Sequence, residues 1–295
     1  TNADGPGRLD VPLGRPTTWS GAPALFFNRN VSEAFKYSRA LAAWARTHVS
    51  EFDAVHVHAV LSHAPLAAAA ACRRASVPYV VRPLGTLASW SLGQKAWRKR
   101  LLLAFGARRM LREAAAMHYT TEEERIDVEA HLDLSRGVVV PLGVEVHPQN
   151  DTAVQEREAR PYVLFLSRLH PKKQLERLID AFATAQLRTT HPWQLVIAGD
   201  GDESYVRGLK ARAERAAAGT VRFVGWLSGD DKRALMERAS LFALPSRHEN
   251  FGMSVLEAMA AGVPVLVSPQ VQIAAAIGAA GAGWTTETDQ ASLER

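Results

Sequence analysis

Cysteine is nearly absent from this 295-residue sequence, which contains a single one, Cys72. One cysteine excludes an internal disulfide and agrees with a reducing compartment. Long apolar runs are also missing, since neither a secretory signal peptide nor a stretch long enough to span a bilayer is present. These absences predict a cytoplasmic protein and leave open a peripheral attachment to the inner face of the membrane.

A large excess of charge of one sign is lacking as well. Lys and Arg number 35 against 30 Asp and Glu, which gives a net charge of +5. No nucleic-acid motif accompanies this modest excess, so we expect no nucleic-acid partner. The apolar fraction of 47% is enough for two cores of ordinary domain size. Strand and helix patterns alternate along the chain, which predicts a parallel α/β architecture.

The most informative segment follows an apolar run. The run 241–244 predicts a buried strand, 245–252 a loop, and 253–261 a helix. Ligands of open α/β sheets bind at the carboxyl ends of strands, where a helix N-terminus can hold anionic phosphate. Glu249 lies in this loop and Glu257 in the helix. Because carboxylates accept hydrogen bonds from hydroxyls, the pair suits a sugar at one end and a ribose at the other.

This segment resembles the signature of the family 4, or group 1, retaining glycosyltransferases. Members have the GT-B fold, in which two Rossmann-like α/β domains with parallel sheets face each other across a cleft. The resemblance implies that Glu249 contacts the donor hexose and that Glu257 contacts the ribose. It also implies that the intervening backbone contacts the diphosphate and the sugar, at Asn250, Phe251, Gly252, Met253 and Ser254. Two glutamates at this spacing also occur by chance on solvated helices, but the aromatic, glycine and serine residues between them favour the family.

A second match lies upstream, where a predicted buried strand, 162–166, ends in a cationic loop. Arg168 and Lys173 resemble the family's donor-phosphate arginine and lysine, which with Glu249 are the predicted catalytic residues. Cations at this edge can neutralise the charge that builds on a departing diphosphate. Ser167 and Gln174 stand where the family usually has glycine, which leaves the backbone conformation of the loop open.

Further donor-binding residues are predicted between the two motifs. The strand, turn, helix and strand of this region are expected over 193–198, 199–202, 204–217 and 221–226. Gly199 fits a turn that lets backbone approach a ligand, and Val224 with Gly225 resembles the family's base-binding segment. Asp200 and Asp202 mimic the metal-binding Asp-x-Asp of the other main glycosyltransferase fold. Because the remaining motifs belong to the metal-independent class, we expect neither a metal nor a cofactor beside the donor.

The first domain, 1–148, is expected to carry the acceptor side, and the second, 149–295, the nucleotide sugar. Strands over 53–58 and 77–82 flank a helix over 61–75 in the first domain. The loop after the second of these strands suggests Arg82, Gly85 and Thr86 as acceptor-side residues. Leu84 replaces the histidine that many relatives carry there.

Three histidines, His56, His58 and His63, stand near the first of these strands. No acidic or thiol ligand accompanies them in a metal-binding pattern, so we expect structural roles in the core or at the strand end.

The excess of positive charge is confined to the first half. Residues 1–150 hold 18 Lys and Arg against 13 Asp and Glu, many of them on a predicted helix around Lys95–Arg112 with Trp90 and Trp97 nearby. A basic helix with interfacial aromatics can sit on an anionic membrane surface. A solvated cationic helix face is an equally weighted interpretation.

The sequence therefore predicts a retaining transferase that moves a hexose from a nucleoside diphosphate sugar to a glycan or lipid-linked glycan acceptor, in surface polysaccharide biosynthesis. We expect the first βαβ elements of one domain and the C-terminal helices of the other to be missing, which puts the activity of this chain in doubt. Two alternatives stay open: a sugar-nucleotide epimerase or hydrolase of the same fold, and a non-catalytic remnant that binds a nucleotide sugar.

Overall fold

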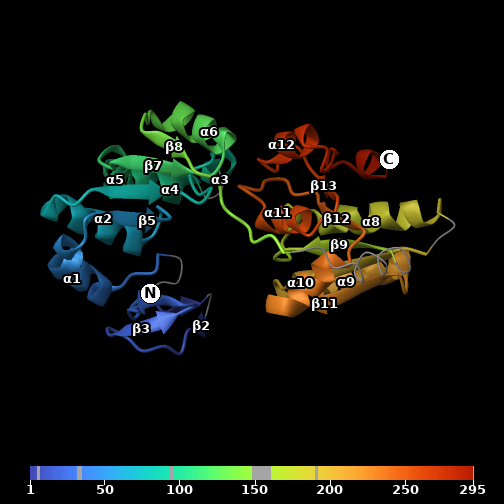
Figure 1. Cartoon of the computed structure of the whole chain (residues 1–295), viewed down its shortest axis with the longest axis horizontal. Coiled ribbons are helices and arrows are strands. Elements are labelled where there is room, and N and C mark those ends of the chain that lie inside the picture. The colour runs from blue at the N-terminus through green and yellow to red at the C-terminus, as the bar shows by residue number, and fades with distance from the viewer. Residues whose placement is uncertain (5–6, 32–34, 94–95, 148–160, 190–191, 295) are drawn as a thin grey trace. The chain divides into compact units, whose positions relative to one another are not determined.

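The computed structural model describes residues 1–4, 7–31, 35–93, 96–147, 161–189 and 192–294. The chain divides into two compact units, Thr1–Pro141 and Leu142–Arg295, which run from blue to green and from green to red in Figure 1. The domain boundary that the sequence predicts, after residue 148, falls outside the described residues. Each unit has its own sheets and its own hydrophobic core.

The first unit is built on a parallel sheet with the strand order β5-β6-β7-β8. These strands are β5 (Val55–His58), β6 (Tyr79–Arg82), β7 (Ala116–Tyr119) and β8 (Gly137–Val139). Two antiparallel hairpins precede the sheet, made by β1 (Ala3–Asp4) with β2 (Gly7–Arg8) and by β3 (Pro16–Trp19) with β4 (Ala22–Leu25). None of the described residues before α1 thus belongs to the parallel sheet.

Helices complete the first unit. They are α1 (Arg39–His48), η1 (Val49–Glu51), α2 (His63–Ala75), α3 (Ser89–Gly93), α4 (Ala96–Leu102), the π-helical turn η2 (Leu103–Ala107), α5 (Arg108–Arg112) and α6 (Glu122–Leu132). Side chains alternate across a strand, so one face of the sheet buries Val57, Val81 and Met117 in the core. The predicted basic helix is interrupted at η2, and Lys95 lies outside the described residues.

The second unit holds a six-stranded parallel sheet in the order β11-β10-β9-β12-β13-β14. Its strands are β9 (Tyr162–Leu166), β10 (Gln194–Ala198), β11 (Val221–Gly225), β12 (Leu241–Leu244), β13 (Val265–Val267) and β14 (Gly283–Thr285). This is the doubly wound order in which the chain reverses its direction of travel between β9 and β12. The two segments that carry the predicted site therefore flank the reversal point.

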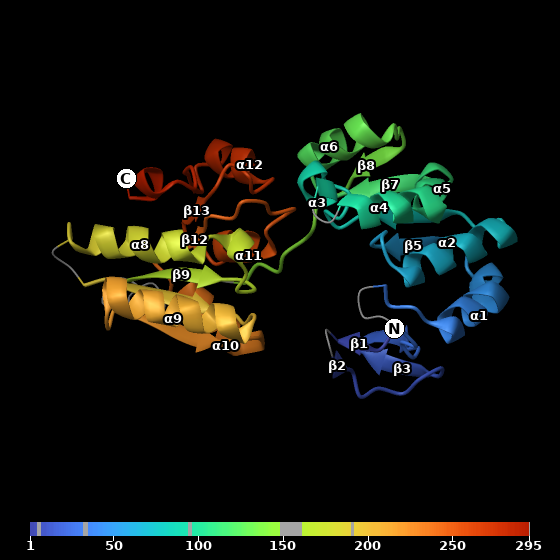
Figure 2. The ribbon, with the colours of Figure 1, turned by 180° about the vertical axis from the view of Figure 1, so that it is seen from behind.

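The helices of the second unit connect successive strands, except for the last one, which follows β14. They are η3 (Pro171–Lys173), α8 (Leu175–Gln186), α9 (Glu203–Ala217), α10 (Gly229–Glu237), α11 (Met253–Ala260), α12 (Ala274–Ala279) and α13 (Gln290–Leu293). Helices α8 and α9 pack side by side, as the opposite view in Figure 2 shows, and Arg212 Nε donates to Asp180 Oδ1 at 2.7 Å between them. The strands and helices predicted from sequence in this unit are confirmed, with ends displaced by a residue or two.

The apolar strand β12 illustrates why this sheet forms. Phe242, Ala243 and Leu244 are fully buried between β9 and β13. A parallel strand covered on both faces reads as a continuous apolar run rather than an alternating one. The run therefore fixes β12 in the interior of the sheet. The loop that follows it lies at the carboxyl ends of the strands.

Candidate functional site

Three loops of the second unit, those after β9, β12 and β13, meet at the carboxyl ends of their strands. Arg247 N donates to Lys172 O at 2.8 Å, which joins the loop after β12 to the loop after β9. Glu249 N donates to Gln270 O at 3.1 Å, and Gln272 N donates to Glu249 O at 3.2 Å. The loop that contains Glu249 is thereby held on both sides by backbone hydrogen bonds.

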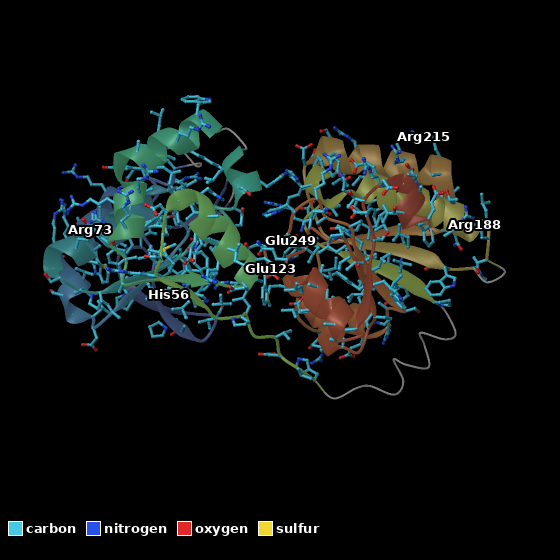
Figure 3. All side chains as sticks on the ribbon, turned by 90° about the horizontal axis from the view of Figure 1, so that it is seen from above. His56, Arg73, Glu123, Arg188, Arg215 and Glu249 are labelled. Atoms are coloured by element: carbon cyan, nitrogen blue, oxygen red, sulfur yellow. The ribbon has the colours of Figure 1, made fainter. Side chains whose placement is uncertain are left out.

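Figure 3 shows where this loop lies in the unit. Glu249 is at one end of the second unit, whereas Arg188 and Arg215 lie at the opposite end, beyond the last turn of α8 and in the last turn of α9. Helices that follow parallel strands end at the amino edge of the sheet. The picture thus places Glu249 at the carboxyl edge, where open α/β sheets bind their ligands.

Lys173 and Glu249 form an ion pair at this edge, although 76 positions separate them in sequence. The Lys173 side chain is 6% exposed and that of Glu249 is 18% exposed. Burial lowers the pKa of Lys173, and the carboxylate of Glu249 opposes that shift. The structure therefore brings two of the three predicted catalytic residues into contact in a largely dehydrated position.

The loop after β9 has the left-handed backbone conformation that glycine would favour, although Gln174 replaces the glycine. Gln174, which stands where the family usually has glycine, has φ +58° and ψ +34°, the left-handed conformation that glycine adopts without strain. It follows the single turn η3, which carries Lys173. Arg168, the third predicted catalytic residue, is exposed in the same loop.

Helix α11 begins directly after the loop that contains Glu249. Gly252 is the N-cap with φ +77°, and Val255 N donates back to its carbonyl at 2.8 Å. Phe251 is buried beneath the turn, while Met253 is 37% exposed. The first N–H groups of a helix lack intrahelical partners and carry partial positive charge, so this terminus can bind an anion.

Glu257 lies in the second turn of α11, and its partner was not foreseen from the sequence. Lys232 Nζ, on α10, donates to Glu257 Oε1 at 2.6 Å. No local pattern signals this contact, because the two residues belong to separate helices. Ser254, in the first turn of α11, is half-buried, as is Asn250 in the preceding loop.

The glycine turn after β10 has a packing role. Gly199 has φ +135°, and a Cβ atom there would collide with the carbonyl oxygen of Ser167. Gly199 therefore allows the loop after β9 to pack closely against this turn. Gly199 N donates to Gly225 O at 2.7 Å, which brings the end of β11, with Val224 and Gly225, next to the same turn.

The Asp-x-Asp pair in this turn makes local hydrogen bonds. Asp200 Oδ1 accepts from Gly201 N at 2.7 Å, and Asp202 caps α9 by accepting from Ser204 N and Tyr205 N. Within the described residues, no three His, Cys, Asp or Glu side chains gather in a group that could hold a metal ion. Metal independence stays a prediction.

In the first unit, the predicted acceptor-side loop is held by a buried carboxylate. Gly85 N donates to Glu124 Oε1 at 3.0 Å, and Glu124 is 1% exposed. Leu84 has φ +55° and Gly85 φ +67°, so two successive residues are left-handed. Thr86 Oγ1 donates to Pro83 O at 2.6 Å.

The sequence analysis did not predict a role for Glu124. Its position three residues after Thr121 has the spacing of a capping box, which could have indicated it.

Arg82 and the histidines lie at the sheet of this unit. Arg82 ends β6, and its buried Nε atom has no hydrogen-bond partner among the residues that the structure describes. His63 Nδ1 accepts from Ser38 N at 3.2 Å, in agreement with its predicted structural role. His56 is largely exposed on its strand, with its Nε2 atom 3.3 Å from His118 Nδ1. Partial desolvation lowers the pKa of His56, and the nearby charge of His118 adds to this shift.

Family profiles match both units of the chain. The profile described as "Glycosyl transferases group 1" matches residues 147–294, and the one described as "Glycosyl transferase 4-like domain" matches residues 2–143. The first covers half of the chain and contains every predicted donor-side residue.

Curated relatives are similar over shorter stretches. A GDP-mannose-dependent α-(1-6)-phosphatidylinositol dimannoside mannosyltransferase of Mycobacterium tuberculosis is 38% identical over 142 residues, which cover 44% of this chain and 35% of that protein. A GDP-mannose:cellobiosyl-diphosphopolyprenol α-mannosyltransferase of Xanthomonas oryzae is 40% identical over 109 residues, 34% of this chain and 28% of its own length. The matches thus span about a third of these relatives.

Solved structures are similar over most of the chain. The Anabaena protein HepE in complex with UDP and glucose superposes with a TM-score of 0.67 at 21% identity, covering 87% of this chain and 70% of its own. A sucrose-phosphate synthase from Thermosynechococcus elongatus gives a TM-score of 0.76 at 17% identity, covering 97% of this chain and 75% of its own. The predicted GT-B fold class is confirmed by these neighbours.

Proposed function

The chain belongs to the group 1 glycosyl transferases, and from that premise we propose that it is the core of a retaining enzyme that moves a hexose from a nucleoside diphosphate sugar to a glycan or lipid-linked glycan acceptor. The observation that carries the proposal is the buried Lys173–Glu249 pair at the reversal point of the sheet. Relatives that use GDP-mannose and a structural neighbour that holds UDP and glucose support a nucleoside diphosphate donor. The names of two relatives include a phosphatidylinositol dimannoside and a cellobiosyl-diphosphopolyprenol, which supports a lipid-linked acceptor and a role in surface polysaccharide synthesis.

In this proposal the diphosphate lies at the N-terminus of α11. Lys173 has three N–H donors, so its ammonium can bind a phosphate oxygen while it stays paired with Glu249. The exposed guanidinium of Arg168 adds a second cation from the same loop. Fixed positive groups at the place where charge develops lower the barrier to departure of the diphosphate.

Glu249 then orients the hexose, and Glu257 accepts hydrogen bonds from the ribose. Since the proposal includes no protein nucleophile, retention follows from attack on the face that the phosphate leaves. The acceptor oxygen bonds to the anomeric carbon, the bond from that carbon to the phosphate oxygen breaks, and this phosphate oxygen takes the proton of the acceptor hydroxyl. Arg82, Gly85 and Thr86 are the proposed acceptor-side residues of the first unit.

A binding screen tests the donor site. We expect ligand-observed NMR with UDP-, GDP- and ADP-sugars to show binding of one nucleotide class to the 295-residue chain. Glu257→Ala should weaken the affinity for that nucleotide sugar at least tenfold. Arg188→Ala, at the opposite end of the unit, is the matched control and should bind like the wild type. Binding that survives Glu257→Ala unchanged would contradict the assignment of the ribose site.

Product analysis separates transfer from the two alternatives. An epimerase or hydrolase of this fold would convert the donor without any acceptor, and a non-catalytic remnant would bind it without turnover. A transferase is expected to release the nucleoside diphosphate in proportion to the acceptor added.

We also propose that the first unit rests on an anionic membrane surface, on the cytoplasmic side. The α4–α5 surface, defined here as Trp97, Arg100, Leu101, Arg108 and Arg112, is exposed, with Trp97 at 64% and Leu101 at 48%. Lys99 points inward instead and donates to Ser91 Oγ at 3.1 Å. Within the described part of the chain, no helix is both long and apolar enough to cross a bilayer. Cations beside interfacial aromatics favour the surface of an anionic bilayer.

A further inference from the structure

Helix α10 supplies a cation to the proposed ribose site. Lys232 Nζ lies 2.6 Å from Glu257 Oε1, and the two side chains are 29% and 28% exposed. A hydrogen bond between two ionised groups is shorter and stronger than a neutral one. At this half-buried position the pair is less screened than a surface ion pair, so it fixes the side-chain conformation of Glu257.

The geometry leaves the second carboxylate oxygen available. Lys232 occupies Oε1 of Glu257, while Oε2 has no hydrogen-bond partner within the described residues. An ionised carboxylate only accepts hydrogen bonds, and each of its oxygens has room for more than one. Glu257 therefore presents Oε2 as an oriented acceptor in the second turn of α11, close to the helix N-terminus.

Charge gives Lys232 a second effect. A nucleoside diphosphate brings negative charge to the N-terminus of α11, and an unpaired Glu257 carboxylate nearby would repel it. The Lys232 ammonium offsets this repulsion. Its neighbour Arg233 pairs within α10 instead, with Asp230 at 2.9 Å and Glu237 at 3.8 Å.

We propose that Lys232 is a positioning residue that holds Glu257 so that the site selects the ribose of a nucleoside diphosphate over 2′-deoxyribose. The proposal rests on the proposed donor site and adds to it the sugar selectivity of the nucleotide. It predicts a change in a binding ratio, which a purely structural role of Lys232 would not produce.

The test compares UDP and GDP with their 2′-deoxy counterparts by isothermal titration calorimetry, using the 295-residue chain. We expect the wild type to prefer the ribonucleotide by about tenfold, the value of one hydrogen bond to a charged group. Lys232→Met, which keeps the length of the side chain, should reduce the preference to about twofold or less, and Lys232→Arg should retain most of it. Arg233→Met is the matched control on the same helix and should keep the wild-type ratio.

A double variant separates positioning from folding. Once Glu257→Gln is present, adding Lys232→Met should not lower the ribose preference further, because Lys232 acts only through the carboxylate of Glu257. An unchanged ratio in Lys232→Met, or a wild type that binds both nucleotides equally, would overturn this inference and leave the donor site standing. If the wild type bound neither nucleotide, the proposed function would fail first and this inference with it.

Discussion

Lys173 carries its charge in a position where burial opposes ionisation. Removing its partner should therefore cost more than removing the lysine itself. We expect Glu249→Ala to lower the free energy of unfolding by about 3 kcal/mol, because it leaves a buried ammonium unpaired. Lys173→Met should cost less than half of that, since the remaining carboxylate is partly exposed. Urea unfolding of the two variants measures both values, and equal losses would contradict the argument.

The lowered pKa of Lys173 also predicts a pH dependence of stability. In the folded state the lysine releases its proton below its ordinary pKa of 10.5, so the unfolded state binds more protons between the two values. In that window the contribution of Lys173 to stability rises with pH, and below it the contribution is constant.

The difference in unfolding free energy between the wild type and Lys173→Met isolates this effect from other titrating groups. We expect the difference to shift in favour of the wild type as the pH rises towards 10.5, as measured by urea unfolding at a series of pH values. A difference that moves in favour of the variant over the same range would show that the lysine is not destabilised by burial.

At the scale of elements, helix α6 shows how one buried glutamate in its first turn organises a loop that follows another strand. Thr121 is the N-cap and accepts from Glu124 N at 3.0 Å. The Glu124 carboxylate accepts from Thr120 N at 2.9 Å and from Gly85 N at 3.0 Å. The start of α6 and the left-handed loop after β6 thus share one buried side chain.

Glu124→Ala should lower the free energy of unfolding by about 2 to 3 kcal/mol, because two buried N–H groups lose their acceptor. Glu123→Ala removes an exposed carboxylate from the same first turn and should change stability by about 0.5 kcal/mol or less. Thermal and urea unfolding of both variants measure the contrast. A loss in Glu123→Ala as large as in Glu124→Ala would indicate that helix charge, and not the loop contact, matters.

At the scale of the whole molecule, positive charge is the property that distinguishes the two halves. The excess lies in residues 1–150, while residues 151–295 hold 17 cations and 17 anions by subtraction from the totals of 35 and 30. The proposed membrane attachment through the α4–α5 surface should therefore depend on where charge is placed as well as on how much there is.

Reversing two cations of that surface tests this dependence. Arg100→Glu with Arg108→Glu should reduce co-sedimentation with phosphatidylglycerol vesicles at least tenfold, since each cation contributes about 1 kcal/mol at an anionic surface. Arg188→Glu with Arg215→Glu makes the same change in net charge in the second unit and should have little effect. Equal losses in the two double variants would point to unspecific attraction by net charge.

Much of the second unit was predictable because its signals are local. The apolar run of β12, the loop that follows it and the start of α11 were located from periodicity alone. The basic helix was predicted less well, because side-chain packing directs Lys99 inward to Ser91 and a π-helical turn interrupts the segment. Periodicity does not specify such contacts.

The sequence by itself determined the family, the strands and helices of the second unit, and the residues of the two motifs in that unit. Only the tertiary structure decided which of these residues meet. Lys173 reaches Glu249 because β9 and β12 are neighbours in the sheet, and Lys232 reaches Glu257 because α10 packs on α11. Local patterns reflect the conformational preferences of short segments, whereas these pairs depend on how distant segments bury their apolar faces together.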